Sequence, residues 1–458
     1  MTRSRPRSLT TLVVLFIASV ATGAFAQDAH YWTTQFGNRA RLLGGAVVGS
    51  TRDLSATYYN PGGLALVPTA EILLAGNVFT YTRYEATAPN GETLPSSSLV
   101  LSPSLFAGEI PGQVVGDHRI AYSFLNRQQA NFRLQGRGSA GGDSFGFPDL
   151  ELIADNRQIE VSLSESWFGA TWSYKAAEHV GLGVTTYFAS RNQSVQFLKF
   201  TQALGENRRA GAAIQNRQFN YNNYALLWKI GFATQSEGWD LGLTVTTPRV
   251  SFAGSGATGF DSTAVGQDID GNGNAITEVA TNTQGDLSSD FQSPLSIAIG
   301  AAVGLGTAKL HVTGEWFAPV DEFVVLPSEP FVGQSSGELI DTAITRELTD
   351  VFNIAIGLDN RFGEKLIAYA SFRTDRSGFD GSSGAPVPIG DWDLYHIAGG
   401  ATFTVGRSEL TAGAIVSYGD STTSRVFRPV EGDQAMDNAI KVDYFRLAFI
   451  VGFNFAFN

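Results

Sequence analysis

Histidine and cysteine, two residues often found in catalytic sites, are scarce in this 458-residue chain, which has five histidines. Cysteine is absent, which excludes disulfides, thiolate metal sites and cysteine nucleophiles. The histidines are scattered, with no pair four residues apart and no HExxH sequence. His396 lies in DLYHIAGG, which no serine nucleophile motif follows, so nothing signals a Ser-His-Asp triad, although one built across strands stays open. We therefore expect that the protein is not an enzyme.

One acidic stretch, residues 268–278, resembles the start of a calcium-binding loop. Asp268, Asp270 and Asn272 place oxygen ligands at positions 1, 3 and 5, and Gly273 follows at position 6. Glu278 is displaced by one position from EF-hand spacing, so the alternative is a plain acidic extracellular loop. We hypothesise a Ca²⁺ site here and expect no other cofactor.

The composition limits the remaining classes of protein. The formal net charge of −12 disfavours nucleic-acid binding. Only 16% of residues are charged and 43% are hydrophobic, which excludes a disordered chain. Glycine is frequent, with 51 residues, which suits turns and crowded backbone contacts.

The first 26 residues have the pattern of a secretory signal peptide. Arg3, Arg5 and Arg7 form a basic region, residues 9–21 are mostly apolar, and Ala24-Phe25-Ala26 offers small residues for cleavage. No stretch of 18 apolar residues follows. The mature chain is therefore expected to be periplasmic, secreted, or a β-barrel, whose strands give a weaker hydropathy signal.

The C-terminal sequence favours the barrel. From Phe445 to Phe457 the odd positions are all bulky and apolar, whereas the even positions are mostly small or polar and include Arg446. Such alternation is the strand period, and it suits a wall with lipid outside and a polar lumen inside. Asn458 leaves the aromatic residue Phe457 penultimate rather than terminal.

Similar patterns upstream predict an all-β fold, a transmembrane antiparallel β-barrel of about 14 strands in the bacterial outer membrane. The expected strands are 70–87, 98–110, 117–133, 158–176, 178–200, 217–234, 238–254, 286–305, 307–325, 348–363, 364–377, 391–406, 407–427 and 439–457. Tight turns alternate with expected long outer loops at 134–157, 201–216, 255–285, 326–347, 378–390 and 428–438. Six tryptophans are expected in the interfacial girdles: Trp167, Trp172, Trp228, Trp239, Trp316 and Trp392.

Residues 27–68 lack the alternating pattern and are expected to form a hatch inside the lumen, ahead of a barrel at 69–458. The turn Asn60-Pro61-Gly62-Gly63-Leu64 combines a proline that restricts Asn60 with two glycines that allow unusual dihedrals. Such a compact segment can plug a barrel, and the alternative is a plain turn before the first strand.

The segment from Gly44-Gly45-Ala46 to this turn resembles the N-terminal hatch signature of the FadL/OmpP1/TodX family. Members usually have alanine where this chain has Gly62. Outer-membrane proteins of the PorV type, which assist secretion, share a similar signature. The resemblance therefore identifies the superfamily better than the substrate.

The resemblance implies passive uptake of hydrophobic compounds, most often long-chain fatty acids, through a lumen pocket and a hatch, with lateral release through the wall. Pro103 is our candidate for the lateral gate, because proline removes a ladder hydrogen bond; Pro248, Pro294 and Pro319 also fall in or beside strands. Candidate contacts for a ligand carboxylate are Arg39, Arg41, Arg52 and Arg446.

The expected partners are a hydrophobic small molecule and the lipids and lipopolysaccharide of the outer membrane, with no nucleic acid. The alternatives are a PorV-type secretion partner and a general porin, although an open porin needs no plug. The sequence does not determine the oligomeric state.

Overall fold

The computed structural model describes residues 29–67, 71–87, 93–110, 116–140, 150–205, 210–267, 276–379, 392–423 and 440–456. The expected signal peptide therefore lies outside the described residues, as do Asp268, Asp270, Asn272 and most of the loops expected at 378–390 and 428–438. Within the described residues, no helix is both long and apolar enough to cross a membrane.

Three short helices precede a series of strands. The helices are α2 (Asn38–Leu42), α3 (Ala56–Tyr59) and α4 (Pro61–Leu64). The first strands are β1 (Glu71–Thr87), β2 (Thr93–Glu109), β3 (His118–Ala140), β4 (Leu150–Ala177), β5 (Val180–Gly205), β6 (Ala210–Gln235), β7 (Trp239–Thr246), β8 (Val250–Gln267), β9 (Ile276–Ser288) and β10 (Ser296–Leu305). The others are β11 (Ala308–Phe317), β12 (Val320–Leu326), β13 (Phe331–Val332), β14 (Leu339–Ile340), β15 (Ile344–Leu348), β16 (Val351–Phe362), β17 (Leu366–Asp375), β18 (Leu394–Val405), β19 (Ser408–Thr423) and β20 (Ile440–Ala456).

Fourteen antiparallel strands close into a barrel, which confirms the predicted fold class and strand number. The ring consists of β1–β7, β10, β11 and β16–β20, and pairing of β20 with β1 joins the end of the chain to its first strand. Bulky apolar residues such as Phe449, Phe453 and Phe455 are exposed on the outside, as a lipid-facing surface requires. Of the expected girdle tryptophans, Trp172, Trp239 and Trp316 are exposed, but Trp167 and Trp392 are buried.

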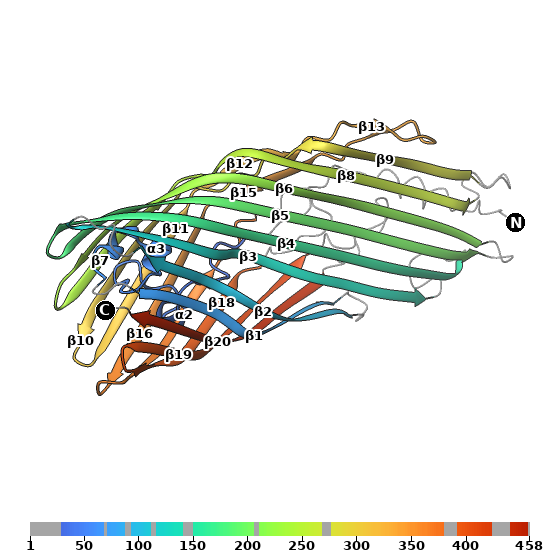
Figure 1. The fold of residues 1–458 in the computed structure, drawn as a ribbon. Coiled ribbons are helices and arrows are strands. Elements are labelled where there is room, and N and C mark those ends of the chain that lie inside the picture. Colours follow the sequence, from blue (N-terminus) through green and yellow to red (C-terminus); the bar gives the residue numbers. More distant parts are fainter. Residues whose placement is uncertain are drawn as a thin grey trace, which may run out of the picture.

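One side of the barrel is much taller than the other. Strands β3, β4, β5, β6, β8 and β9 extend well beyond the ends of β1, β2 and β20 (Figure 1). Several segments expected as loops are therefore partly strand: β3 continues to Ala140, β4 begins at Leu150, β5 continues to Gly205 and β6 begins at Ala210. The β3–β4, β4–β5 and β5–β6 ladders continue along this extension and hold it together.

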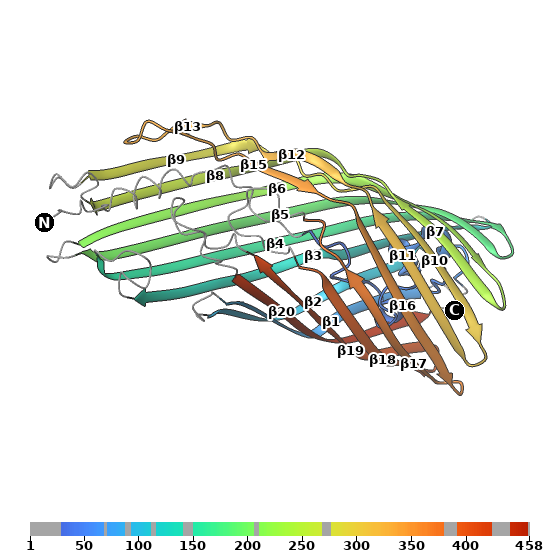
Figure 2. The ribbon, with the colours of Figure 1, turned by 180° about the vertical axis from the view of Figure 1, so that it is seen from behind.

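Prolines mark the places where the wall is interrupted. Strands β7 and β8 both pair with β6 and are separated by three residues around Pro248. Pro294 lies between β9 and β10, and Pro319 between β11 and β12. Seen from behind, the β12–β15 hairpin lies beside β8 and β9 (Figure 2), and Asp290 N donates to Val325 O there. The predicted loops 255–285 and 326–347 thus also contain strands.

Candidate functional site

The described part of the N-terminal segment, residues 29–67, lies inside the barrel and is held by strands from opposite sides of the wall. The Asn38 side chain hydrogen-bonds to that of Asn454 on β20, at 2.7 Å. On the other side, Thr185 Oγ1 and Tyr187 Oη on β5 both donate to Thr57 O, at 2.8 and 2.9 Å. Leu42, Leu43, Leu54 and Leu64 are fully buried among small and apolar wall residues. The segment therefore fills the lumen as a plug, and we call it the hatch.

Asn60 is the central polar contact of the hatch. Its Oδ1 accepts from Gly62 N at 3.1 Å, which caps α4, while Pro61 occupies the first helical position. Its Nδ2 donates to Val48 O within the hatch and to Phe232 O on β6, both at 2.8 Å. One buried side chain thus shapes the turn and attaches it to the wall.

At several points the backbone of the hatch lies against glycines of the wall. A Cβ on Gly231 would lie 2.3 Å from Asn60 Oδ1, which no real Cβ contact allows. A Cβ on Gly62 would lie 2.6 Å from Gly181 O. The alanine usual in the resembling family would therefore not fit at Gly62 without a shift of backbone. Glycines on both surfaces let the two backbones approach each other.

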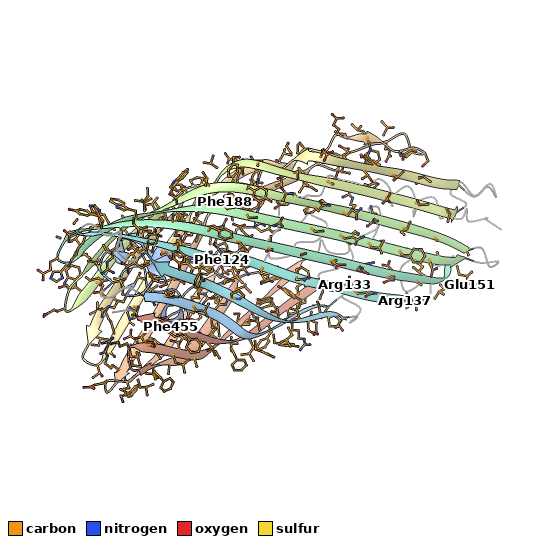
Figure 3. The ribbon with its side chains drawn as sticks, in the orientation of Figure 1. Phe124, Arg133, Arg137, Glu151, Phe188 and Phe455 are labelled. Carbon is orange, nitrogen blue, oxygen red and sulfur yellow. The ribbon has the colours of Figure 1, made fainter. Side chains whose placement is uncertain are left out.

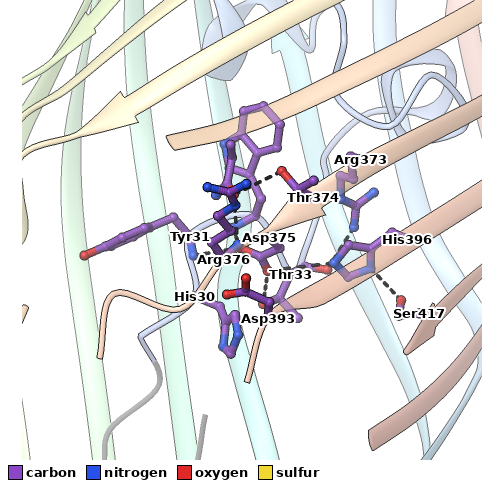
Figure 4. Close-up of polar contacts among 12 residues, drawn as sticks. His30, Tyr31, Thr33, Arg373, Thr374, Asp375, Arg376, Asp393, His396 and Ser417 are labelled. Carbon is purple, nitrogen blue, oxygen red and sulfur yellow. Dashed lines mark hydrogen bonds and ion pairs between the residues drawn. The ribbon is translucent and has the colours of Figure 1, made fainter. Parts of the chain in front are cut away.

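The N-terminal arm of the hatch, residues 29–33, is fastened by a buried carboxylate on β17 (Figure 4). Asp375 Oδ1 accepts from Tyr31 N and Trp32 N, at 3.2 and 2.8 Å. Asp375 Oδ2 accepts from Thr33 Oγ1 at 2.8 Å. Backbone donors at such a carboxylate form charge-assisted bonds, so this clamp fixes the start of the hatch.

Strand pairing places a serine, a histidine and an aspartate in a row at the same clamp. His396 Nδ1 is 2.6 Å from Ser417 Oγ, and His396 Nε2 is 3.8 Å from Asp375 Oδ2 (Figure 4). All three side chains are buried, and the hatch arm occupies both Asp375 oxygens. The 3.8 Å separation exceeds hydrogen-bond length. The row therefore serves as an anchor for the hatch and is not built as a hydrolytic triad.

Two of the arginines predicted from the sequence stabilise the hatch itself. Arg39 Nη2 forms a 3.0 Å ion pair with Asp359, and Arg39 Nη1 donates to Ser50 O. Burial acts to lower the pKa of Arg39, but Asp359 and other acidic groups together raise it above its ordinary value. Arg41 Nη1 donates to Gly76 O at 2.9 Å. Burial, together with the positive charges of Arg446 and Arg373, lowers the pKa of Arg41 to about 9.

The other two predicted arginines also contact the chain itself. Arg446 Nη1 is 3.4 Å from Thr33 O, and Arg52, half exposed, lies 3.7 Å from Asp240. A lumen cavity lies beside Tyr31 and Tyr58 of the hatch, and none of the four predicted arginines lines it. Their contact with a ligand carboxylate stays a prediction.

A cavity of about 60 Å³ lies above the hatch, between its arm and the outer part of the lumen. Tyr31 and Tyr58 of the hatch, Trp167, Phe291 and Phe317 give it apolar walls. Its charged lining residues are Arg127, Lys229, Arg346, Glu165 and Glu315. The cavity thus combines apolar surface with an excess of cations.

Lys229 and Arg127 both contact neutral groups beside the cavity. Lys229 Nζ donates to Thr246 Oγ1 at 2.9 Å and lies 4.5 Å from the centroid of the Tyr58 ring, and both groups are neutral. Arg127 Nη2 donates to Tyr31 O at 2.7 Å. Neither of these contacts involves a carboxylate.

Phe291 is surrounded by three guanidinium groups next to the cavity. The guanidinium carbons of Arg191, Arg249 and Arg346 lie 4.0, 4.9 and 4.8 Å from the ring centroid. Glu165 pairs with Arg191 at 2.7 Å and with Arg249 at 3.5 Å. Nε and Nη2 of Arg249 are buried without a hydrogen-bond partner. One carboxylate therefore serves two arginines.

The wall has a lateral gap between β2 and β3. Their described ladder runs from Leu105–Leu125 to Glu109–Ala121, whereas β3 pairs with β4 along its whole length. A space of about 640 Å³ lies between residues 95–99 of β2 and 131–135 of β3. Pro103 lies just beyond the last β2–β3 pair, where the β1–β2 register also shifts. The candidate gate residue is thus at the edge of the gap.

The sequence did not identify Lys229, Arg346 or Glu165 as site residues. The signal for Lys229 was present: in residues 217–233 the odd positions face the lumen, and Lys229 stands among them between Leu227 and Gly231. A lone cation at a lumen-facing position is such a signal. Of the described residues, no three His, Asp or Glu side chains are grouped to hold a metal.

The fold and the plug together define a β-barrel of the bacterial outer-membrane type with a filled lumen. No family model matches the sequence, and no curated protein matches it. Solved structures do match the fold. The toluene transporter TodX of P. putida is 12% identical, covers 94% of this chain and 99% of its own, and has a TM-score of 0.59.

Two other solved structures agree with this match. The toluene transporter TbuX of Ralstonia pickettii is 11% identical, covers 92% of this chain and 98% of its own, and has a TM-score of 0.57. A FadL homologue of Pseudomonas aeruginosa is 12% identical, covers 95% of this chain and 100% of its own, and has a TM-score of 0.56. The chain therefore has the fold of the FadL-type transporters, which confirms at the level of fold the resemblance seen in the hatch sequence.

Replacing Gly231 by valine should unseat the hatch, because the new side chain would overlap Asn60 Oδ1. We expect the backbone amides of residues 56–65 to exchange hydrogen at least about tenfold faster, while the barrel strands stay protected. Hydrogen exchange with mass spectrometry measures both. Gly238→Val is the matched control, since nothing lies within 4 Å of its Cβ position. Equal rates of hydrogen exchange in the two variants would contradict the assigned contact between Gly231 and the hatch.

Proposed function

We propose that the protein is a channel for the passive uptake of hydrophobic compounds and not an enzyme. Long-chain fatty acids are the substrate that we propose first. The observation that carries the proposal is the cavity above the hatch, with aromatic walls and cationic side chains. Names of proteins with this fold, among them toluene transporters and a FadL homologue, support the broader class of ligand. No energy source is needed, because transport follows the concentration gradient.

An apolar cluster in the outer lumen offers the entry route. Phe132, Phe219, Phe291 and Phe323 are buried in one cluster that includes residues of β3, β6, β12 and β20. Phe291 belongs to both this cluster and the lining of the cavity. An apolar chain can therefore pass from the outer lumen to the cavity without leaving apolar contacts, which favours its transfer from water.

The charge of the cavity favours a fatty acid over a plain hydrocarbon. Lys229 and Arg346 line the cavity, and Arg249 lies next to it, against the ring of the lining residue Phe291. A carboxylate would supply the acceptor that the Arg249 nitrogens lack, and charge-assisted bonds of this kind are strong in a dry site. A hydrocarbon would leave those nitrogens without a partner.

The gap between β2 and β3 provides the exit that lateral release requires. It begins next to Pro103, and the exposed Leu99 on β2 faces outward near it. Pro95, Leu99 and Phe132 supply the apolar part of the lining of the gap, and its other lining residues are polar or charged. The hatch argues against a general porin, because it fills the lumen that a porin leaves open.

Lys229→Met should weaken binding of a fatty acid but not of its uncharged analogue. The substitution keeps the apolar stem against Tyr58 and removes the charge, so we expect about a tenfold higher Kd for oleate and no change for oleyl alcohol. Competition against a fluorescent fatty acid on the purified protein measures both, and toluene provides the hydrocarbon comparison. Lys365→Met, in the exposed turn between β16 and β17, is the control. If wild type bound acid, alcohol and toluene alike, the carboxylate preference would be refuted.

Cross-linking the two edges of the gap should stop uptake. Leu99→Cys and Arg133→Cys place thiols on residues that border the gap, in a chain that has no other cysteine. A bismaleimide that joins them should abolish uptake of labelled oleate by cells, whereas each single variant treated in the same way should transport normally. Normal uptake through the joined wall would rule out this exit.

A further inference from the structure

On the taller side of the barrel, the outward side chains change from aromatic to polar beyond a row of phenylalanines. Phe124, Phe168 and Phe188 lie on neighbouring strands, with centroids 4.8 and 6.3 Å apart, and Phe252 lies 6.1 Å from Phe188. Aromatic rows of this kind mark the boundary between hydrocarbon and headgroups. Figure 3 shows Phe124 and Phe188 low on the wall, and Arg133, Arg137 and Glu151 successively farther along its extension.

One register, formed by Asn126, Ser166, Ser190 and Tyr224, follows the row on the side away from the short turns, and two registers of polar outward side chains lie beyond it. The first joins Gln129, Ser164, Asn192, Asn222 and Ser255 across five strands, and the second joins Asn131, Ser162, Ser194 and Asn220. We call these nine residues the polar face. Eight of them are exposed and Asn222 is partly exposed, whereas inward neighbours such as Phe132, Leu163 and Val195 are buried.

All nine side chains of the polar face are uncharged amides or hydroxyls. The short side of the barrel is different at the corresponding level, just beyond the outward aromatics Tyr418 and Phe445. There the outward residues are charged, with Lys441 2.8 Å from Asp443 and with Asp420 directly opposite Asp443 on the neighbouring strand. The lack of charge on the polar face is thus a local property and not a rule for this barrel.

We propose that the polar face binds the uncharged sugars of the outer-leaflet glycolipid, the saccharide part of lipopolysaccharide. Asn, Gln and Ser side chains both donate and accept hydrogen bonds, as sugar hydroxyls do. Continuity with the aromatic row places the face where those sugars begin. Its nine residues include no cation, and Arg133 on the next register is paired with Glu160 at 2.7 Å, which disfavours phosphate groups as the ligand.

The face is already ordered before it binds. The β3–β4, β4–β5 and β5–β6 ladders continue in register through it, so the side chains stand at fixed strand spacing. Within the face, Asn222 Nδ2 donates a hydrogen bond to Ser255 Oγ at 3.1 Å. A rigid, flat set of donors and acceptors loses little conformational entropy when a saccharide docks on it.

The test compares thermal unfolding in nanodiscs of two lipopolysaccharides, one with its full core saccharide and one lacking the neutral core sugars. We expect the full saccharide to raise the Tm of the wild type by about 3 °C. A variant with Ser164→Ala, Asn192→Ala, Ser194→Ala and Asn220→Ala should lose that rise. Comparing the two lipids within each variant removes any general effect of the substitutions on stability.

The matched control carries four alanine substitutions on the short side, at Arg83, Asp420, Lys441 and Asp443, and should keep the full rise. The polar face lies outside the lumen, so both variants should bind oleate as the wild type does; loss of oleate binding would concern the proposed function instead. An equal Tm in the two lipids for the wild type, or an undiminished rise in the polar-face variant, would overturn the proposal.

Discussion

The close approach of the hatch backbone to the glycines of the barrel wall is the constraint on which the rest of the structure depends. Gly231 and Gly62 leave room for the Asn60 amide to join hatch and wall, and a single Cβ at either glycine would separate them. Because the hatch is seated there, its arm reaches across the lumen to Asp375 and forms the floor of the cavity. The position of the ligand cavity is therefore a consequence of backbone contact.

Charge is distributed unevenly around this plug. Below the cavity, carboxylates such as Asp359 and Asp375 are used by the hatch, through Arg39 and through backbone donors. In the cavity and around Phe291, cations exceed the carboxylates, and Glu165 alone serves two arginines. Burying such an excess is costly in a protein interior unless an anion or water shares the site. The same division that holds the plug in place leaves positive charge in the space above it, as the proposed uptake of an amphipathic anion requires.

The sequence was sufficient for the parts of the fold that follow a local pattern. Alternation from Phe445 onward predicted β20, and the sum of similar segments predicted fourteen strands. The extension of β3 to Ala140 and the start of β4 at Leu150 were missed, because exposed residues there, such as Gln135 and Arg137, are polar and these segments were expected as a loop. The partners of Arg39 and the alignment of His396 with Ser417 depend on strand register across hundreds or tens of residues, which local pattern does not encode.

The most direct test of the central claim is the ion conductance of the protein with and without its hatch. Residues 29–67 would be deleted behind the intact signal sequence, and barrel formation verified by heat-modifiable migration on gels. In planar bilayers the wild type should carry no steady ion current, and the deleted form should show large, stable openings, because the seated hatch fills the lumen between opposite walls. A conducting wild type, or a folded barrel that stays closed without its hatch, would contradict this account.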